Sequence, residues 1–263
     1  MTHIDAAILG LVQGLTEFLP VSSSGHLVLA QHMLGLGGAE NLTMDLLLHV
    51  ATLAAVLISF RADIIRLVVG ITSDAGQRRL ALLLLAAMVP TGIIGLSIKP
   101  FIAGAFDRPA VVGALLVATG VLLYVAPRLR RPTGSLSDLR LPQALWIGLA
   151  QGVAVLPGVS RSGTTICAGM LGGMTGEAAA RFSFLLAVLA IGAAMVLNIP
   201  DAASLAETQF STVAVGMVVA FVSGMLSIRL LIRVARRGRF DGFAYYCWTI
   251  GVVAVGVALW PGR

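Results

Sequence analysis

The feature that most constrains the fold of this chain is a polar segment that occurs twice in an otherwise apolar sequence. Residues 10–26 read GLVQGLTEFLPVSSSGH, and residues 148–164 read GLAQGVAVLPGVSRSGT. At an offset of 138 residues and without a gap, the two segments are identical at eight of seventeen positions. Matching segments interrupted by glycine and proline in both halves of an apolar chain indicate a site at a repeat interface within a membrane.

The composition indicates an integral membrane protein. Hydrophobic residues make up 58% of the chain and charged residues only 11%, about half the charge of a soluble domain. The net charge of +6 would suggest nucleic acid in a soluble protein, but most of the arginines lie in loops, where they report topology. We therefore expect the lipid bilayer, and no nucleic acid, as a partner. Cys167 and Cys247 lie in apolar runs and predict no disulfide framework or zinc site.

Hydropathy divides the chain into spans and hairpins. A span needs about 20 residues. Six apolar segments meet that length, near 43–60, 80–98, 109–126, 178–198, 211–235 and 242–260. The motif segments 4–36 and 142–175 are broken by polar residues and by Pro20 or Pro157, which leaves halves too short to cross. We expect two re-entrant helix–loop–helix hairpins, whose bare backbone must be covered by protein or line a wet cavity.

The arginines predict the orientation. Eleven lie in the stretches 61–79, 127–141 and 236–241, whereas only Lys99, Arg108 and Arg263 lie in the opposing stretches 35–42, 99–108, 199–210 and 261–263. The arginine-rich side should be cytoplasmic. The first hairpin then enters and leaves from the outer face, and the second from the inner face.

The expected fold is therefore an all-α integral membrane protein with one polytopic membrane domain, 1–263. It contains two inverted-topology repeats, 1–127 and 140–263. Each repeat is a re-entrant hairpin followed by three transmembrane helices. The glycine pairs Gly10/Gly14 and Gly148/Gly152 should let another backbone approach the first helix of each hairpin closely.

The first hairpin carries a carboxylate at membrane depth. Gln13 and Glu17 are four residues apart and share one face of a helix. A neutral acid hydrogen-bonded to a neighbouring helix is one interpretation of Glu17. We favour a functional role, because ionisable groups inside membranes are usually functional.

Both hairpin loops end in a predicted helix start. Ser22-Ser23-Ser24-Gly25 precedes one apolar run, and Ser160-Arg161-Ser162-Gly163-Thr164-Thr165 precedes another. Serines here are ordinary helix caps when taken singly. Two helix starts that face each other near the midplane would also present free N–H groups and form an anion site. The planar guanidinium of Arg161 suits bidentate phosphate binding, so the pair predicts a phosphate or diphosphate site.

The four histidines are not equally good candidates for a functional role. His26 shares a short segment with Glu17 and the serines and should face Arg161, so we favour a catalytic role over a packed core histidine. His49 and Asp45, on one face of the first full span, are evenly balanced between function and hydrogen-bonded packing. His3 and His32 look peripheral.

At these residues the chain resembles a known family. QGLTEFLPVSSSGH together with LPGVSRSGTT is similar to the two signature motifs of the undecaprenyl-diphosphate phosphatase family of the bacitracin-resistance type, and FRADIIRL and RFSFLLAV extend the similarity. The resemblance implies hydrolysis of undecaprenyl diphosphate to undecaprenyl phosphate and inorganic phosphate, which recycles the lipid carrier for cell-wall synthesis. It implies a multi-pass protein of the bacterial plasma membrane, with its site facing the periplasm or cell exterior. A homodimer is compatible with the sequence.

The resemblance also implies a divalent cation, Mg²⁺ or Ca²⁺. Many members carry Glu where this chain has Gln13, so a two-carboxylate metal site is not available here, and Glu17 with substrate oxygens must supply most ligands. We expect catalytic roles for Glu17, Ser23, His26 and Arg161. The expected substrate-binding residues are Gln13, Ser22, Ser24, Gly25, Ser160, Ser162, Gly163, Thr164 and Thr165.

Three candidate nucleophiles, water, Ser23 and His26, and one rival function remain at this point. Glu17 with His26 activates water or Ser23, or His26 is itself phosphorylated. The rival function is a transporter or flippase for an anionic prenyl-lipid carrier, because inverted repeats around broken helices are typical of transporters. Hydrolysis requires Glu17 and His26, whereas transport requires only the anion site and alternating access.

Overall fold

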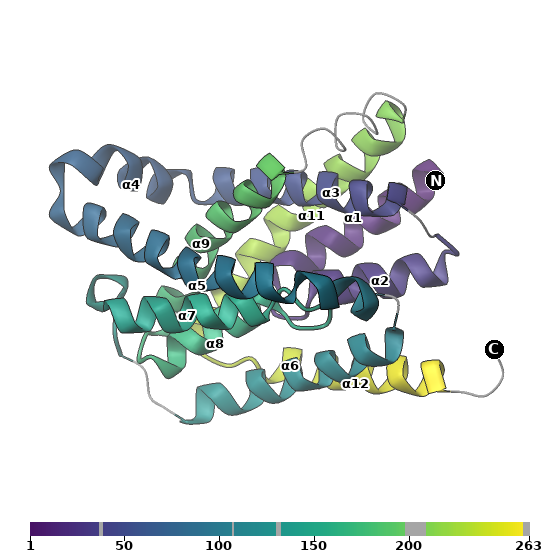
Figure 1. Ribbon diagram of the computed structural model, residues 1–263. Helices are drawn as coiled ribbons and strands as arrows, with labels where there is room; N and C mark the ends of the chain where they lie inside the picture. Colours follow the sequence, from purple (N-terminus) through teal and green to yellow (C-terminus); the bar gives the residue numbers. More distant parts are fainter. Residues whose placement is uncertain (37–38, 107, 130–132, 198–208, 260–263) are drawn as a thin grey trace.

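The computed structural model describes residues 1–36, 39–106, 108–129, 133–197 and 209–259, and these ranges are almost entirely helical (Figure 1). They contain no β-strand. Their one extended pairing is an isolated bridge between Gly134 and Met174. A 3₁₀ turn, η1 (Leu136–Asp138), lies in the loop before the second motif. The expected all-helical class is confirmed.

Five helices are long and apolar enough to cross a membrane. They are α5 (Ala75–Phe106), α6 (Pro109–Leu129), α9 (Gly176–Leu197), α11 (Phe210–Arg237) and α12 (Asp241–Leu259). Each covers one of the predicted spans, which confirms a multi-pass membrane protein. The helix α5 continues past the predicted boundary at residue 98, so most of the stretch 99–108 is helix rather than loop.

The remaining predicted span, 43–60, coincides with the helix α3 (Ala39–Ser59). At Phe60 the chain bends by 75° and continues as the helix α4 (Arg61–Ser73). We expected a loop from residue 61 onward because of Arg61 and Arg66, and that prediction is wrong for α4. The apolar residues between and after these arginines continue in a helix, and Figure 1 shows α4 at one end of the molecule, beside the first half of α5.

The two motif segments form broken helix pairs. The first consists of α1 (His3–Phe18) and α2 (Ser23–Met33), and the second of α7 (Leu141–Val153) and α8 (Arg161–Leu171). All four helices, of 16, 11, 13 and 11 residues, are shorter than the roughly 20 residues of a span. In Figure 1, α2, α7 and α8 lie between α3 on one side and α6 and α12 on the other.

Glycines set the helix packing around both pairs. A Cβ atom on Gly10 would overlap the carbonyl oxygen of Gly216 in α11, and one on Gly148 would overlap that of Ala87 in α5. The predicted close backbone approach at these glycines is confirmed. It brings α1 against α11 and α7 against α5, and so fixes where the polar ends of α1 and α7 lie.

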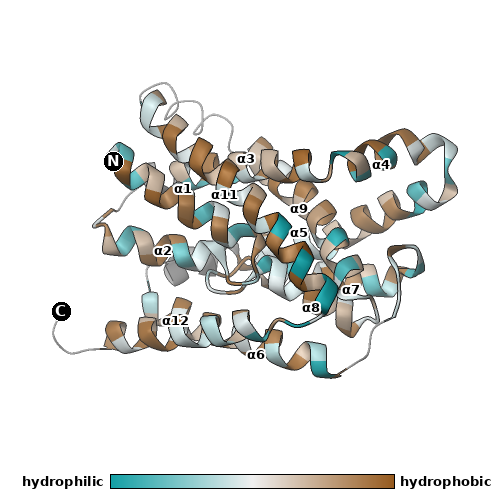
Figure 2. Ribbon diagram, turned by 180° about the vertical axis from the view of Figure 1, so that it is seen from behind, coloured by the Kyte–Doolittle hydropathy of each residue, from teal (hydrophilic) through white to brown (hydrophobic). Residues whose placement is uncertain are grey.

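Apolar side chains cover the outside of the molecule. Exposed large hydrophobic residues include Val89 of α5, Val222 of α11 and Val252 of α12. Figure 2 shows that apolar residues are common along the helices and that α11 changes from apolar to hydrophilic toward its C-terminal end. Such a surface suits contact with lipid rather than water.

Candidate active site

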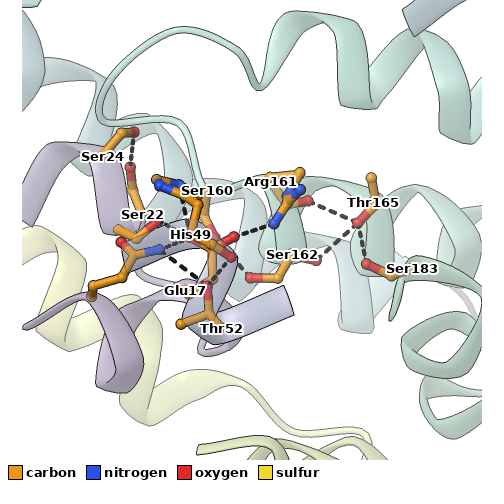
Figure 3. Close-up of polar contacts among 12 residues, drawn as sticks. Glu17, Ser22, Ser24, His49, Thr52, Ser160, Arg161, Ser162, Thr165 and Ser183 are labelled. Atoms are coloured by element: carbon orange, nitrogen blue, oxygen red, sulfur yellow. Dashed lines mark hydrogen bonds and ion pairs between the residues drawn. The ribbon is translucent and has the colours of Figure 1, made fainter. Parts of the chain in front are cut away.

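The structure brings four side chains onto the carboxylate of Glu17 (Figure 3). This side chain lies in the last turn of α1 and is only 3% exposed. One oxygen, Oε1, accepts from Nη2 of Arg161. The other, Oε2, accepts from Oγ of Ser23 at 2.5 Å and from Nε2 of Gln13 at 3.1 Å. Nε2 of His49 lies 3.5 Å from the same oxygen.

Local sequence explains how these groups meet. Gln13 and Glu17 stand one turn apart on α1, as their spacing predicts. Ser23 and Arg161 are the first residues of α2 and α8. Both helices begin as predicted, because Oγ of Ser22 accepts from the backbone of Gly25 at 3.3 Å and Oγ of Ser160 accepts from that of Gly163 at 3.1 Å.

The two hairpin loops are in direct contact. Oγ of Ser22 also accepts from the backbone N–H of Gly158 at 3.1 Å. Oγ of Ser162 donates to the carbonyl of Leu19 at 3.1 Å. Ser22 has φ of 69°, in the left-handed region that non-glycine residues seldom adopt. Such conformations persist where surrounding contacts hold them, and they cluster at functional sites.

A third element fixes the second loop. Thr119, buried in the middle of α6, donates to the carbonyl of Gly158 at 3.0 Å and accepts from the backbone of Ser160 at 3.2 Å. Thr119 was not among the predicted site residues, because a single threonine in an apolar helix is common and carries no motif. Its contacts satisfy loop backbone groups that lipid could not.

His49 is a closer partner of Glu17 than the sequence indicated. Its Nδ1 donates to the carbonyl of Asp45 at 2.7 Å, which directs Nε2 at Glu17. The carboxylate of Asp45 is engaged elsewhere and accepts from Gln31 at 2.8 Å. Of the two balanced candidates on α3, His49 therefore belongs to the site, and Asp45 lends it only a backbone carbonyl.

His26 differs from the expectation. Its Nδ1 donates to the carbonyl of Ser22 at 2.8 Å, so the neutral ring presents Nε2 as the acceptor for the Tyr246 hydroxyl at 2.9 Å. The two rings are stacked with centroids 5.5 Å apart. The ring folds back over the start of α2 toward α12, because it is bonded to the carbonyl four residues earlier. The expected contacts of His26 with Glu17 and Arg161 are not formed, and Tyr246 was missed.

The other expected binding residues have mixed positions. Ser24 lies 3.4 Å from Ser22 through their hydroxyls, and Ser160 lies 3.2 Å from Ser162. Thr165 bonds the carbonyl of Arg161 at 2.7 Å and the hydroxyl of Ser183 at 2.6 Å, so it holds α8 against α9. Oγ1 of Thr164 is buried without a hydrogen-bond partner in the described part of the chain.

The electrostatics of the centre favour an anion. Glu17 is almost fully buried, whereas the side chain of Arg161 is 22% exposed, so the cation is the accessible member of the pair. The first turns of α2 and α8 add N–H groups that no helix geometry can pair internally. This arrangement is compatible with the predicted anion site, and it lies beside a buried carboxylate that accepts a hydrogen bond from Ser23.

The chain is similar to known proteins along its whole length. The sequence profile of the bacitracin resistance protein BacA family matches residues 6–253. A relative named undecaprenyl-diphosphatase from Syntrophotalea carbinolica is 46% identical over 95% of this chain and 97% of its own. Proteins of the same name from Desulfosudis oleivorans (44%; 100% and 99% covered) and Halothermothrix orenii (41%; 98% and 99%) match equally fully.

Proposed function

The chain belongs to the bacitracin resistance protein BacA family, and we propose that it hydrolyses undecaprenyl diphosphate to undecaprenyl phosphate and inorganic phosphate at the centre around Glu17. The full-length relatives named undecaprenyl-diphosphatase support the reaction. One structural observation supports the centre around Glu17 as the location of this reaction. Side chains from α1, α2, α3 and α8 converge on a single buried carboxylate at the contact of the two hairpin loops.

Arg161 binds the diphosphate in this proposal. In the absence of substrate its charge is balanced by Glu17. A diphosphate carries more charge than one carboxylate and accepts bidentate hydrogen bonds from a guanidinium, so it competes for Arg161. The first-turn amides of α2 and α8 add stabilisation of the charge on the transferring phosphoryl group, which is the main requirement of phosphoryl transfer.

Ser23 is the nucleophile that the geometry favours. Its hydroxyl already donates to Glu17 at 2.5 Å, which is the arrangement of a nucleophile with its base. Glu17 takes the proton, Oγ attacks the terminal phosphorus, and the P–O bond to undecaprenyl phosphate breaks. The proton passes from Glu17 to this leaving group, which restores the carboxylate. Water then attacks the phosphoserine, and its hydrogen atoms leave on Ser23 and on phosphate. His26 acts as a positioning residue, because its ring holds the start of α2 against Tyr246.

A divalent cation fits this centre as a site that the substrate completes. Oε1 of Gln13 is buried and has no hydrogen-bond partner among the described residues. With Glu17 and Ser23 it offers oxygen donors, which Mg²⁺ and Ca²⁺ prefer. The described residues contain no cluster of three acidic, histidine or cysteine ligands, so substrate and water must complete the shell. Bound there, the ion would neutralise charge on the diphosphate.

Gln13→Glu should lower the divalent-ion concentration that gives half-maximal activity by about tenfold, because a second carboxylate is worth roughly 1.4 kcal/mol or more to a dication. The measurement is the rate of phosphate release as Mg²⁺ is titrated into protein from which divalent ions have been removed with a chelator. Gln151→Glu, the same change at the repeat-related position, should leave the half-maximal concentration unchanged. An equal ion requirement in wild type and Gln13→Glu would remove Gln13 from the cation site.

The proposed inverted-repeat topology rests on the distribution of arginines and on which helices pack against each other. Two inverted repeats predict that α1 packs on α11 as α7 packs on α5, and that α6 packs on its counterpart α12. All three pairs are in contact, which supports the repeats. The proposed centre then opens to the periplasmic or outer face. The homodimer stays a prediction that crosslinking would test.

Orientation is tested with two single cysteines at exposed positions. Arg108→Cys, before α6, should react with a membrane-impermeant thiol reagent on intact cells, whereas Thr133→Cys should react only after lysis. The native Cys167 and Cys247 are buried, so the wild type is the unlabelled control. Labelling of Thr133→Cys alone on intact cells would invert the topology.

A further inference from the structure

A second polar region lies where α3, α4, α9 and α11 meet. A cavity of about 510 Å³ opens beside the bend at Phe60. Its charged lining comes from three parts of the chain: Arg61 and Asp63, Arg181, and Arg229, Arg233 and Arg236. None of these residues contributes to the centre around Glu17.

The charges around this arginine cavity do not balance. Asp63 lies 3.5 Å from Arg181, and Glu177 lies 3.2 Å from Arg181 and 3.1 Å from Arg236. Two carboxylates against five guanidiniums leave three positive charges. Neither Arg229 nor Arg233 forms an ion pair with any residue that the structure describes. The cavity therefore has more guanidinium groups than carboxylates to pair with them.

Topology alone does not explain this arrangement. The positive-inside pattern needs arginines near the cytoplasmic end of a span on any face. Here Arg229, Arg233 and Arg236 follow the i, i+4, i+7 spacing and lie on one face of α11. Arg229 lies eight residues before the helix end, about 12 Å along its axis, which is deeper than a headgroup layer of roughly 5–8 Å. An arginine at that depth is costly unless an anion accompanies it.

The same face of α11 continues into the membrane as an apolar stripe. Val218, Val222 and Leu226 precede the arginines on this face and are 62%, 53% and 57% exposed. Figure 2 shows the transition from apolar to hydrophilic residues along the helix. A ligand that matches the whole face has an anionic head and an apolar tail.

We propose that the arginine cavity binds the phosphate group of an anionic glycerophospholipid, with the acyl chain along Val218, Val222 and Leu226. Guanidinium forks bind phosphate bidentately, and basic pockets between helices on this side of a membrane bind lipid headgroups. Free inorganic phosphate shares the head chemistry but would leave the stripe uncovered.

Native mass spectrometry of the purified full chain, titrated with phosphatidylglycerol or phosphatidylcholine, tests the proposal. Phosphatidylglycerol should bind at least about tenfold more tightly than phosphatidylcholine. Changing both Arg229 and Arg233 to Gln should abolish that preference while phosphatase activity persists. The matched control changes Arg78 and Arg237 to Gln, which removes two exposed arginines outside the cavity and should keep the preference.

A further variant and a competition experiment test the identity of the site and of its occupant. Asp63→Asn removes a competing negative charge and should tighten phosphatidylglycerol binding about threefold, a gain that misfolding cannot produce. Millimolar inorganic phosphate should not displace the lipid. Equal loss in the cavity and control variants, or no gain with Asp63→Asn, would overturn the site. Displacement by inorganic phosphate would overturn the lipid as its occupant.

Discussion

Replacing Glu17 by glutamine should lower kcat for phosphate release from undecaprenyl diphosphate by about 10²–10⁴-fold, the usual contribution of a general base. The amide keeps the size of the side chain but cannot take the proton of Ser23. It also leaves Arg161 without its counter-ion, which diphosphate then supplies. Lipid binding should therefore persist or strengthen, as measured by equilibrium binding of the substrate to the variant.

The control for this change is Glu177→Gln. Glu177 lies at the start of α9 and pairs with Arg181 and Arg236, and it forms no ion pair with the residues around Glu17. Its replacement should leave kcat within about threefold, since exposed ion pairs contribute little. His26→Ala should lower kcat less than Glu17→Gln, because His26 contacts Tyr246 and not Glu17. Wild-type turnover in Glu17→Gln would remove the base from the mechanism.

Arg161→Lys should lower kcat/KM at least about tenfold, or roughly 1.4 kcal/mol, and Arg161→Ala by about 10²–10³-fold. Lysine keeps the charge but loses the planar fork that reaches Glu17 and phosphate together. Steady-state kinetics of both variants, with Arg140→Lys as a control at an exposed arginine, measure the effect. Near-normal turnover in Arg161→Lys would exclude bidentate binding.

The contact between Arg161 and Glu17 also predicts that the effects of substituting both residues on turnover are not additive. Because Arg161 and Glu17 are in contact, combining Arg161→Lys with Glu17→Gln should cost less than the product of the single effects. Independent effects would mean that the ion pair has no part in turnover.

Hydropathy predicted most of the fold because lipid permits so few solutions. Backbone groups without water must be paired internally, so a long apolar run is a helix. The same reasoning failed at α4. Arginines at residues 61 and 66 suggested a loop, whereas the chain only bends at Phe60 and stays helical. The bend depends on tertiary packing, so the local amino-acid composition does not predict it.

The centre was predictable where its residues share a motif. Gln13, Glu17 and Ser23 lie on one hairpin, and the repeat pointed to Arg161 on the other. His49 and Tyr246 were harder, because their positions depend on how α3 and α12 pack against α1 and α2. Tyr246 lies 220 residues from His26. Residues separated so far are joined by the fold alone, and no spacing in one sequence reveals them.

Comparing Ser23→Ala with Ser24→Ala tests the central claim most directly. Both changes remove one hydroxyl from the first turn of α2, but only Ser23 bonds Glu17, whereas Ser24 lies beside Ser22. The measurement is release of inorganic phosphate from undecaprenyl diphosphate by the purified chain, at saturating substrate and divalent ion. We predict a loss of at least about 10²-fold in kcat for Ser23→Ala and less than about tenfold for Ser24→Ala. Equal kcat in the two variants, or full turnover without Ser23, would contradict the account.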